Sequence, residues 1–151
     1  MAEIPVLPTA IDNVLDAVDT LLRAEIKTDG LLEGVRQVGR MSYELPSPPF
    51  PGVWYYAGTM KPVSKNGVRN RWRMPVVLAS LTFSDNPQKG SEDATRIAAA
   101  AQTTLLKSGN LTCSCVSLTE PESFEPAAPI DRKQQMYSAL AMVMVEFTAL
   151  R

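Results

Sequence analysis

Apolar residues recur at helical spacing near the start of the chain. Between residues 9 and 26 they occur every three or four positions, while three aspartates fall on another face. This pattern is typical of a helix with one buried side, and Thr9 followed by Asp12 indicates its start as a capping box. The positions expected to be buried are Ile11, Val14, Leu15, Val18, Leu21, Leu22 and Ile26.

A second helix is indicated between Ser91 and Lys107. Ser91 is a favoured N-cap residue, Lys107 would lie in the last turn, and Gly109 follows the expected end. Its expected buried stripe consists mostly of small side chains, which would let the helix axis come close to a sheet. The stripe is Ala94, Ile97, Ala98, Ala101 and Leu105.

Two segments rich in β-branched and aromatic residues predict a long hairpin. The segments, 53–63 and 68–83, are separated by an Asn66–Gly67 pair that favours a tight turn. Pro62 and Pro75 cannot donate a ladder hydrogen bond, so each is expected at an edge position or a bulge.

The remaining segments complete a fold-class prediction. The glycine- and proline-bearing stretch 29–52 is expected to cross between elements without a long element of its own. Two more strands are expected at 111–119 and 136–147, joined by a proline- and glutamate-bearing loop at 120–135. The order predicts an α+β fold, with a long hairpin in a largely antiparallel sheet packed against two main helices. A length of 151 residues suits a single domain, 1–151.

Both faces of the expected terminal strand are apolar, which is unusual for a strand with one side in water. The two helices could lie on opposite sides of the sheet, or on the same side, which would leave one face bare within the monomer. We predict the second arrangement, with the bare face or the sheet edge covered by the next subunit of a ring. The residues of this second face are Met136, Leu140, Met142 and Met144.

Positive charge is concentrated in the hairpin, where no acid occurs between residues 61 and 73. Such a segment could bind DNA phosphates or an acidic protein surface, or it could keep an exposed hairpin soluble and prevent edge pairing. We predict an interaction arm that meets the helix-face aspartates, Asp12, Asp16 and Asp19, of a neighbouring copy. The basic residues are Lys61, Lys65, Arg69, Arg71 and Arg73.

Candidate chemistry is sparse. The chain has no histidine, which removes the commonest general base and zinc ligand. Glu120, Glu122 and Glu125 fit a solvated loop better than a catalytic pair. Cys113 and Cys115, two apart in an expected strand, would be too distant for a disulfide and are expected to be reduced thiols. We therefore expect no catalytic residues, no cofactor, no metal and no enzymatic activity.

The start of the chain lacks the basic segment and continuous apolar run of a signal peptide. No stretch of about 18 apolar residues occurs that could span a bilayer. We expect the protein to be made and kept in a cytoplasm, with no membrane partner.

The expected elements follow one another in a distinctive order along nearly the whole chain. An amphipathic helix precedes the proline-rich crossing "ELPSPPFPG", a hairpin, an alanine-rich helix ending "LLKSGN", a strand and a final apolar strand. In order and length these elements resemble the tail terminator (tail completion) proteins of long-tailed bacteriophages. The resemblance implies a non-enzymatic structural protein of the virion, assembled in the host cytoplasm, that forms a ring, typically a hexamer. Such a ring caps the tail tube and joins it to the head-to-tail connector at the neck, with DNA passing through its lumen.

Other functions stay open from the sequence. The protein could be another structural protein of the phage neck or tail, or a small nucleic-acid-binding module that uses the basic hairpin with Trp72. Such modules usually present several aromatic residues on a basic domain, whereas this chain has a pI near 5.5. A small cytoplasmic enzyme would require a deep pocket.

Overall fold

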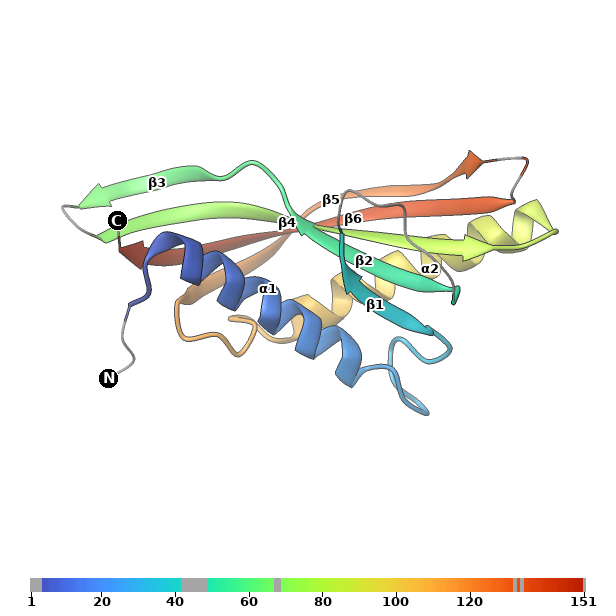
Figure 1. The fold of residues 1–151 in the computed structure, drawn as a ribbon, viewed down its shortest axis with the longest axis horizontal. Helices are drawn as coiled ribbons and strands as arrows, with labels where there is room; N and C mark the ends of the chain where they lie inside the picture. The colour runs from blue at the N-terminus through green and yellow to red at the C-terminus, as the bar shows by residue number, and fades with distance from the viewer. Residues whose placement is uncertain (1–3, 42–48, 67–68, 132, 134, 151) are drawn as a thin grey trace.

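The computed structural model describes residues 4–41, 49–66, 69–131, 133 and 135–150 (Figure 1). Side chains at 64–66, 69 and 129–131 are not described. Gly67 of the expected hairpin turn, and residues 42–48 of the proline-rich crossing, lie outside the described residues.

Two helices and a six-stranded sheet make up the fold. The strands lie in the order β1-β2-β4-β6-β5, and β3 pairs with β4 off this path. Every pairing is antiparallel except that of β1 with β2, so the fold is α+β with a mostly antiparallel mixed sheet, as predicted. The elements are α1 (Leu7–Ala24), β1 (Gln37–Arg40), β2 (Gly52–Ala57), β3 (Lys61–Asn66), β4 (Arg69–Phe83), α2 (Pro87–Lys107), β5 (Val116–Asp131) and β6 (Met136–Leu150).

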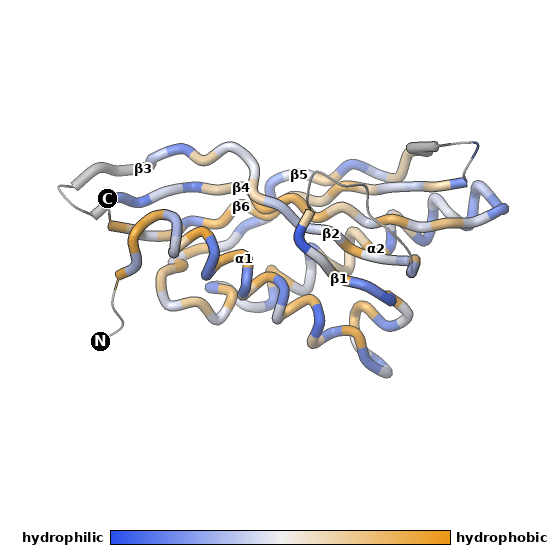
Figure 2. The backbone as a smooth tube through the Cα atoms, in the orientation of Figure 1, coloured by the Kyte–Doolittle hydropathy of each residue, from blue (hydrophilic) through white to orange (hydrophobic). Residues whose placement is uncertain are grey.

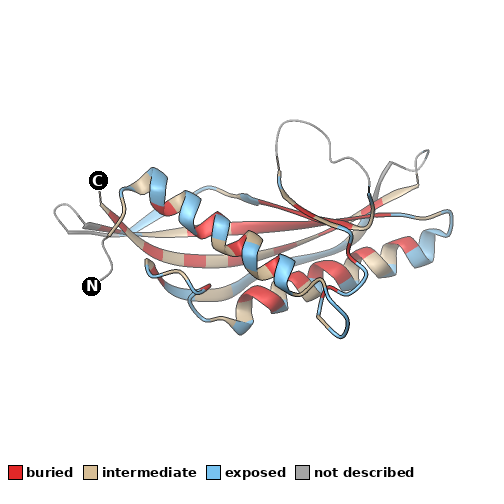
Figure 3. Ribbon diagram, turned by 60° about the horizontal axis from the view of Figure 1, so that its bottom comes forward, coloured by how far each residue is buried: buried red, intermediate tan, exposed pale blue. Residues whose placement is uncertain are grey.

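Both helices pack on the same face of the sheet (Figure 3). Alternate residues of β6, from Tyr137 to Ala149, are at most 6% exposed and form one core with the buried stripes of the helices. Figure 2 shows the matching alternation of hydrophobic and hydrophilic residues along α1. The stripe predicted for α2 is fully buried, whereas Ile11, Leu21 and Ile26 are only partly buried at the margin of the core. The alternative of one helix on each face is therefore excluded.

Helix α1 begins at Leu7, and its N-cap residue, Val6, makes no side-chain cap. The capping box expected at Thr9 is therefore wrong, because Thr9 already lies within the helix. Pro8 in the first turn explains the earlier start, since a proline fits there without needing an N–H donor.

Helix α2 also begins earlier than expected, at Pro87. Its N-cap is Asn86, whose side chain accepts a hydrogen bond from the Lys89 N–H at 3.2 Å. The expected cap at Ser91 is therefore wrong, because asparagine followed by proline provides a complete start with its cap five residues upstream. The helix ends at Lys107, as predicted.

The first segment of the expected hairpin forms two strands, β2 and β3, which both pair with β4. Pro75 of β4 lies at the gap between them, and its carbonyl accepts a hydrogen bond from the Gly58 N–H at 2.7 Å. Pro62 lies on the outer strand β3, beside a register shift that precedes Ser64. The two prolines thus occupy a local edge and a bulge, as predicted.

The stretch expected as a loop, 120–135, is mostly strand, which corrects the sequence interpretation. Strand β5 pairs with β6 along its length, with register shifts at four places. It is the outer strand of the sheet, so its prolines remove N–H donors on a side that needs no ladder partner. The strand expected from residue 111 begins only at Val116, because residues before it form turns in which Leu111 and Thr112 have φ of 56° and 53°.

Candidate assembly surface

The sheet face opposite the helices, here called the open face, carries the second apolar side of β6. Val77 of β4 lies across from Met142, and Ala79 lies across from Leu140, so these side chains share the face. The β6 residues are half-buried, whereas their neighbours on the helix side are at most 6% exposed. The residues predicted to lie on this face are all found there: Met136, Leu140, Met142 and Met144.

One end of the open face is covered by the chain itself. Trp54 of β2 lies across from Ala79, and its ring lies over Gly52, where an added Cβ would be 2.5 Å from the indole. Phe50 meets Trp54 edge-on, with ring centroids 6.3 Å apart. Among the described residues, no helix or strand packs over the part of the face formed by β6.

The basic arm, defined here as β3 and residues 69–75 of β4, is partly neutralised within the chain. Arg71 Nε lies 2.8 Å from Glu146 Oε1, and Arg73 pairs with both Glu146 and Glu120. Through these ion pairs the two arginines connect β4 to β5 and β6 on the open face. Sequence reasoning could not find these pairs, because it did not give the register of β5.

The other residues of the basic arm differ in their surroundings. Lys61 is exposed, and the described part of the chain gives it no ion pair. The side chains of Lys65 and Arg69 lie outside the described residues. Trp72 lies across from Phe147 on the helix side and packs against the core, so it is not presented as an exposed stacking platform.

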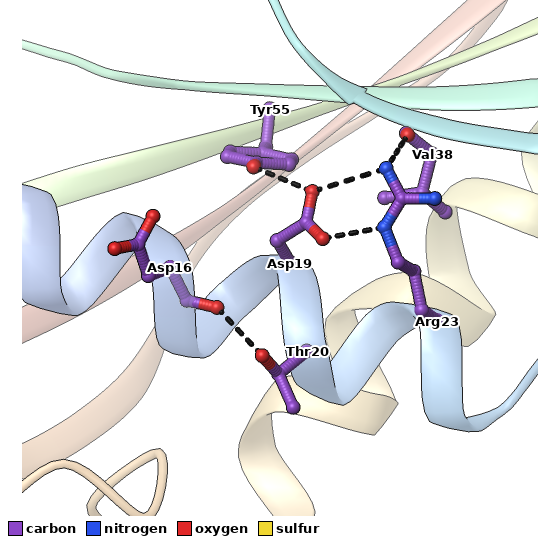
Figure 4. Close-up of polar contacts among 6 residues, drawn as sticks. All are labelled: Asp16, Asp19, Thr20, Arg23, Val38 and Tyr55. Atoms are coloured by element: carbon purple, nitrogen blue, oxygen red, sulfur yellow. Dashed lines mark hydrogen bonds and ion pairs between the residues drawn. The ribbon is translucent and has the colours of Figure 1, made fainter.

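Asp19, on the helix face expected to meet a neighbouring copy, is bound within its own chain (Figure 4). It accepts hydrogen bonds from Arg23 and from the Tyr55 hydroxyl, the latter at 2.7 Å, while Arg23 also donates to the Val38 carbonyl. Burial tends to raise the pKa of the Asp19 carboxyl, but these hydrogen bonds outweigh it, so that pKa lies below its ordinary value. Burial and the contact with Asp19 raise the pKa of the Tyr55 hydroxyl.

The other two aspartates of α1 are more exposed. Asp12 lies 3.4 Å from Arg40 Nη1 in a surface ion pair. Asp16 is exposed, and no side chain of the described residues pairs with its carboxylate. Only Asp16 of the three therefore offers an unpaired carboxylate to a neighbour.

A second group of acids lies along β5. Glu122 and Glu125, here called the acidic edge, are exposed and have no ion pair with any described residue. Glu125 lies across from Leu140, and Ser123 lies across from Met142. Glu125 therefore borders the apolar strip of β6, and Glu122 lies at the register shift between Pro121 and Ser123 on the same strand.

The two cysteines lie closer together than the sequence suggested. Both are free, and their Sγ atoms are 3.4 Å apart, because they sit in the turns before β5 and not in an extended strand. Burial, with a contribution from the neighbouring thiol, raises the pKa of Cys115 to about 12. Cys115 is thus held as a protonated, weakly nucleophilic thiol.

A cavity of about 420 Å³ lies at the opposite end of β4 from the basic arm. Arg96 on its wall pairs with Asp93 at 3.7 Å, and the Thr82 hydroxyl donates to the Gly90 carbonyl. Among the described lining residues, the Thr82 hydroxyl and the Asp93 carboxylate thus have separate partners and are not hydrogen-bonded to each other, as a nucleophile and its general base would be. The lining includes Arg36, Phe50, Thr82, Phe83, Asp93 and Arg96.

Within the described part of the chain, no three Cys, Asp or Glu side chains are grouped as a metal site requires. None of its helices is long and apolar enough to cross a membrane. No protein-family model matches the chain, and no curated protein matches it either. The function must therefore be argued from the fold and its surfaces.

Proposed function

We propose that the protein is a structural ring-forming protein of a bacteriophage tail, acting as a tail terminator. In this proposal a ring of identical subunits, a hexamer, caps the completed tail tube and joins it to the head-to-tail connector. DNA passes through the lumen without sequence-specific contacts. The ring is assembled in the host cytoplasm and becomes part of the virion at the neck.

The observation that carries the proposal is the uncovered apolar strip on the open face. Fully burying an apolar side chain is worth about 1.5–3 kcal/mol. Four such side chains of β6 are only half-buried in the subunit, although the opposite side of the same strand is buried. A second subunit placed on the strip would recover the remaining part of that free energy.

The one-sided arrangement of the helices explains why a partner is needed. A sheet that is apolar on both faces is stable when a layer covers each of them. Here α1 and α2 cover one face, and among the described residues Trp54 with Phe50 covers only one end of the other. The element order, which resembles that of tail terminators, makes a neighbouring copy in a ring the proposed cover.

The charges of the basic arm favour this proposal over a nucleic-acid-binding module. A phosphate-binding surface needs free cations, and exposed aromatic rings when the strand is single. Arg71 and Arg73 are already paired with glutamates, and Trp72 packs on the helix side. The arm therefore supports a protein contact better than a DNA contact.

The proposal is tested by the mass of the purified protein. Native mass spectrometry and light scattering over a range of concentrations should give one closed oligomer, and negative-stain images should show rings. Rings mixed with tubes assembled from a tail tube protein of the same phage should bind at one tube end. A protein that stays monomeric at all concentrations would contradict the proposal.

A further inference from the structure

We infer that the acidic edge of one subunit, Glu122 and Glu125 on β5, receives the basic arm of the next subunit, with Lys61 and Val63 of β3 at the contact. This inference rests on the proposed ring and deepens it, because it assigns the two surfaces that meet. The partner at this contact is a second copy of the same chain.

The basic arm and the acidic edge lie at opposite edges of the same sheet. Strand β5 pairs only with β6, and β3 pairs only with β4, so each is an outer strand. Copies placed side by side by rotation would bring β3 of one copy toward β5 of the next. Each copy would then use two different surfaces, which is the kind of contact that closes into a ring.

The two outer strands are unsuited to joining as one continuous ladder. Pro121 and Pro126 lack N–H donors on β5, which also carries four register shifts. Pro62 and a register shift interrupt β3 in the same way. Because prolines and register shifts disfavour backbone pairing between copies at both edges, we expect the contact to be made by side chains.

The side chains at these edges are complementary. Glu122 and Glu125 are exposed without an ion pair among the described residues, and so is Lys61. Val63 on the arm is 42% exposed, and Leu140 lies next to the acidic edge on the apolar strip. The basic arm thus combines an exposed apolar side chain with positive charge. The acidic edge combines negative charge with the neighbouring apolar strip. Such charges fix register and partner choice more than affinity.

The acidic face of α1 is the rival receiver of the arm. Asp19 is bound to Arg23 and Tyr55, and Asp12 is paired with Arg40. At Asp12 and Asp19 a neighbouring cation would have to displace these internal partners, which leaves only Asp16 unpaired on α1, whereas both carboxylates of the acidic edge are unpaired among the described residues. For this reason we assign the contact of the basic arm to β5 in place of α1.

A charge swap tests the inference. The variant Glu122→Lys with Glu125→Lys, and separately the variant Lys61→Glu, should each raise the concentration needed for half-assembly by about tenfold or more at low salt. Combining all three substitutions should restore assembly to within about threefold of wild type, because opposite charges face each other again. All three side chains are exposed, and circular dichroism with thermal melting should confirm that each variant is folded.

Asp16→Lys with Asp12→Lys is the matched control on α1, and it should leave assembly near wild type. If reversing the acidic edge has no effect while wild type still forms rings, the inference is wrong and the proposed ring stands. If the α1 variant blocks assembly and Lys61→Glu with that variant restores it, the arm meets α1 and the inference is also wrong. If wild type never assembles, both the ring and this contact are rejected.

Discussion

Met142 of β6 lies directly across from Val77 of β4, and both side chains are on the face away from the helices. Val77 is only 2% exposed, whereas Met142 is half-buried, so at this point the accessible surface of the open face belongs to β6. A partner that covers the open face here would therefore contact Met142 more than Val77.

Lysine on the open face should separate assembly from folding. Leu140→Lys combined with Met142→Lys is expected to give a soluble, folded monomer, because both side chains can reach water from the half-buried strip. Light scattering and circular dichroism measure the two properties.

The matched control lies between these positions on the same strand. Ala141 is 0% exposed on the helix side, so Ala141→Lys should unfold the protein by burying a charge in the core. An unfolded Leu140→Lys, Met142→Lys variant, or one that still forms rings, would reject the open face as the subunit contact.

Stability should fall in acid partly through Asp19. Its folded-state pKa lies below the ordinary value of about 4, so its contribution is present above that pH and lost as pH falls through the folded pKa. The unfolding free energy of Asp19→Asn, measured by urea denaturation, should decrease less steeply than that of wild type as the pH is lowered from about 5. Asp16→Asn, at an exposed position, should keep the wild-type slope.

The hydroxyl of Tyr55 should contribute to the same acid dependence. Tyr55→Phe removes a 2.7 Å hydrogen bond to Asp19 and should cost about 1 kcal/mol at pH 7. The Asp19 pKa, followed by NMR, should move upward toward its ordinary value. An unchanged pKa in this variant would show that the contact is not formed in solution.

The start of α2 can be tested by removing each candidate cap. Asn86→Ala should lower the unfolding free energy by about 1 kcal/mol, because the Lys89 N–H loses its acceptor. Ser91→Ala should cost little, since alanine is favoured inside a helix. The reverse ranking would place the cap at Ser91.

The thiol of Cys115 should react slowly in the folded protein. With its pKa raised to about 12, Cys115 holds little thiolate at pH 8, so iodoacetamide should modify it about a hundredfold or more slowly than in urea. Mass spectrometry of timed samples measures both rates. Cys113→Ser should leave assembly unchanged, and a loss of assembly in that variant would assign the thiol a role that we do not expect.

Neutralising one glutamate should have a much smaller effect than reversing the acidic edge. Exposed ion pairs are worth about 0–1 kcal/mol, so Glu120→Gln, Glu122→Gln and Glu125→Gln should each assemble within a few-fold of wild type. Collapse of function in one of them, with structure and assembly intact, would point to carboxylate chemistry instead.

The features that sequence reasoning predicted well depend on local periodicity. Alternation along β6 separates its two faces, and the small-residue stripe of α2 is buried as expected. The position of Pro75 also followed from a local rule, because a missing N–H donor restricts where a strand can place proline.

The features that were missed depend on contacts far apart in the sequence. A proline-bearing segment such as β5 can be a strand when it lies at a sheet edge, and its own residues do not specify that position. The pairing of Arg73 with Glu120 spans 47 residues and follows only from the registers of β4 and β5 on β6. The spacing of Cys113 and Cys115 was wrong because turns replace the expected strand there.

The uninterrupted pairing of β4 with β6 connects the basic arm to the body of the subunit through one continuous ladder. The two strands stay in register over the 15 residues of β4, from the body of the subunit to the arm. At roughly 3.4 Å per residue, this ladder is roughly 50 Å long. The described backbone of β3 and β4 is already paired within the subunit, so docking would immobilise few additional backbone dihedral angles there. A load applied at the arm would travel along the ladder into the methionine strip, so neighbouring contacts in a ring would be mechanically coupled.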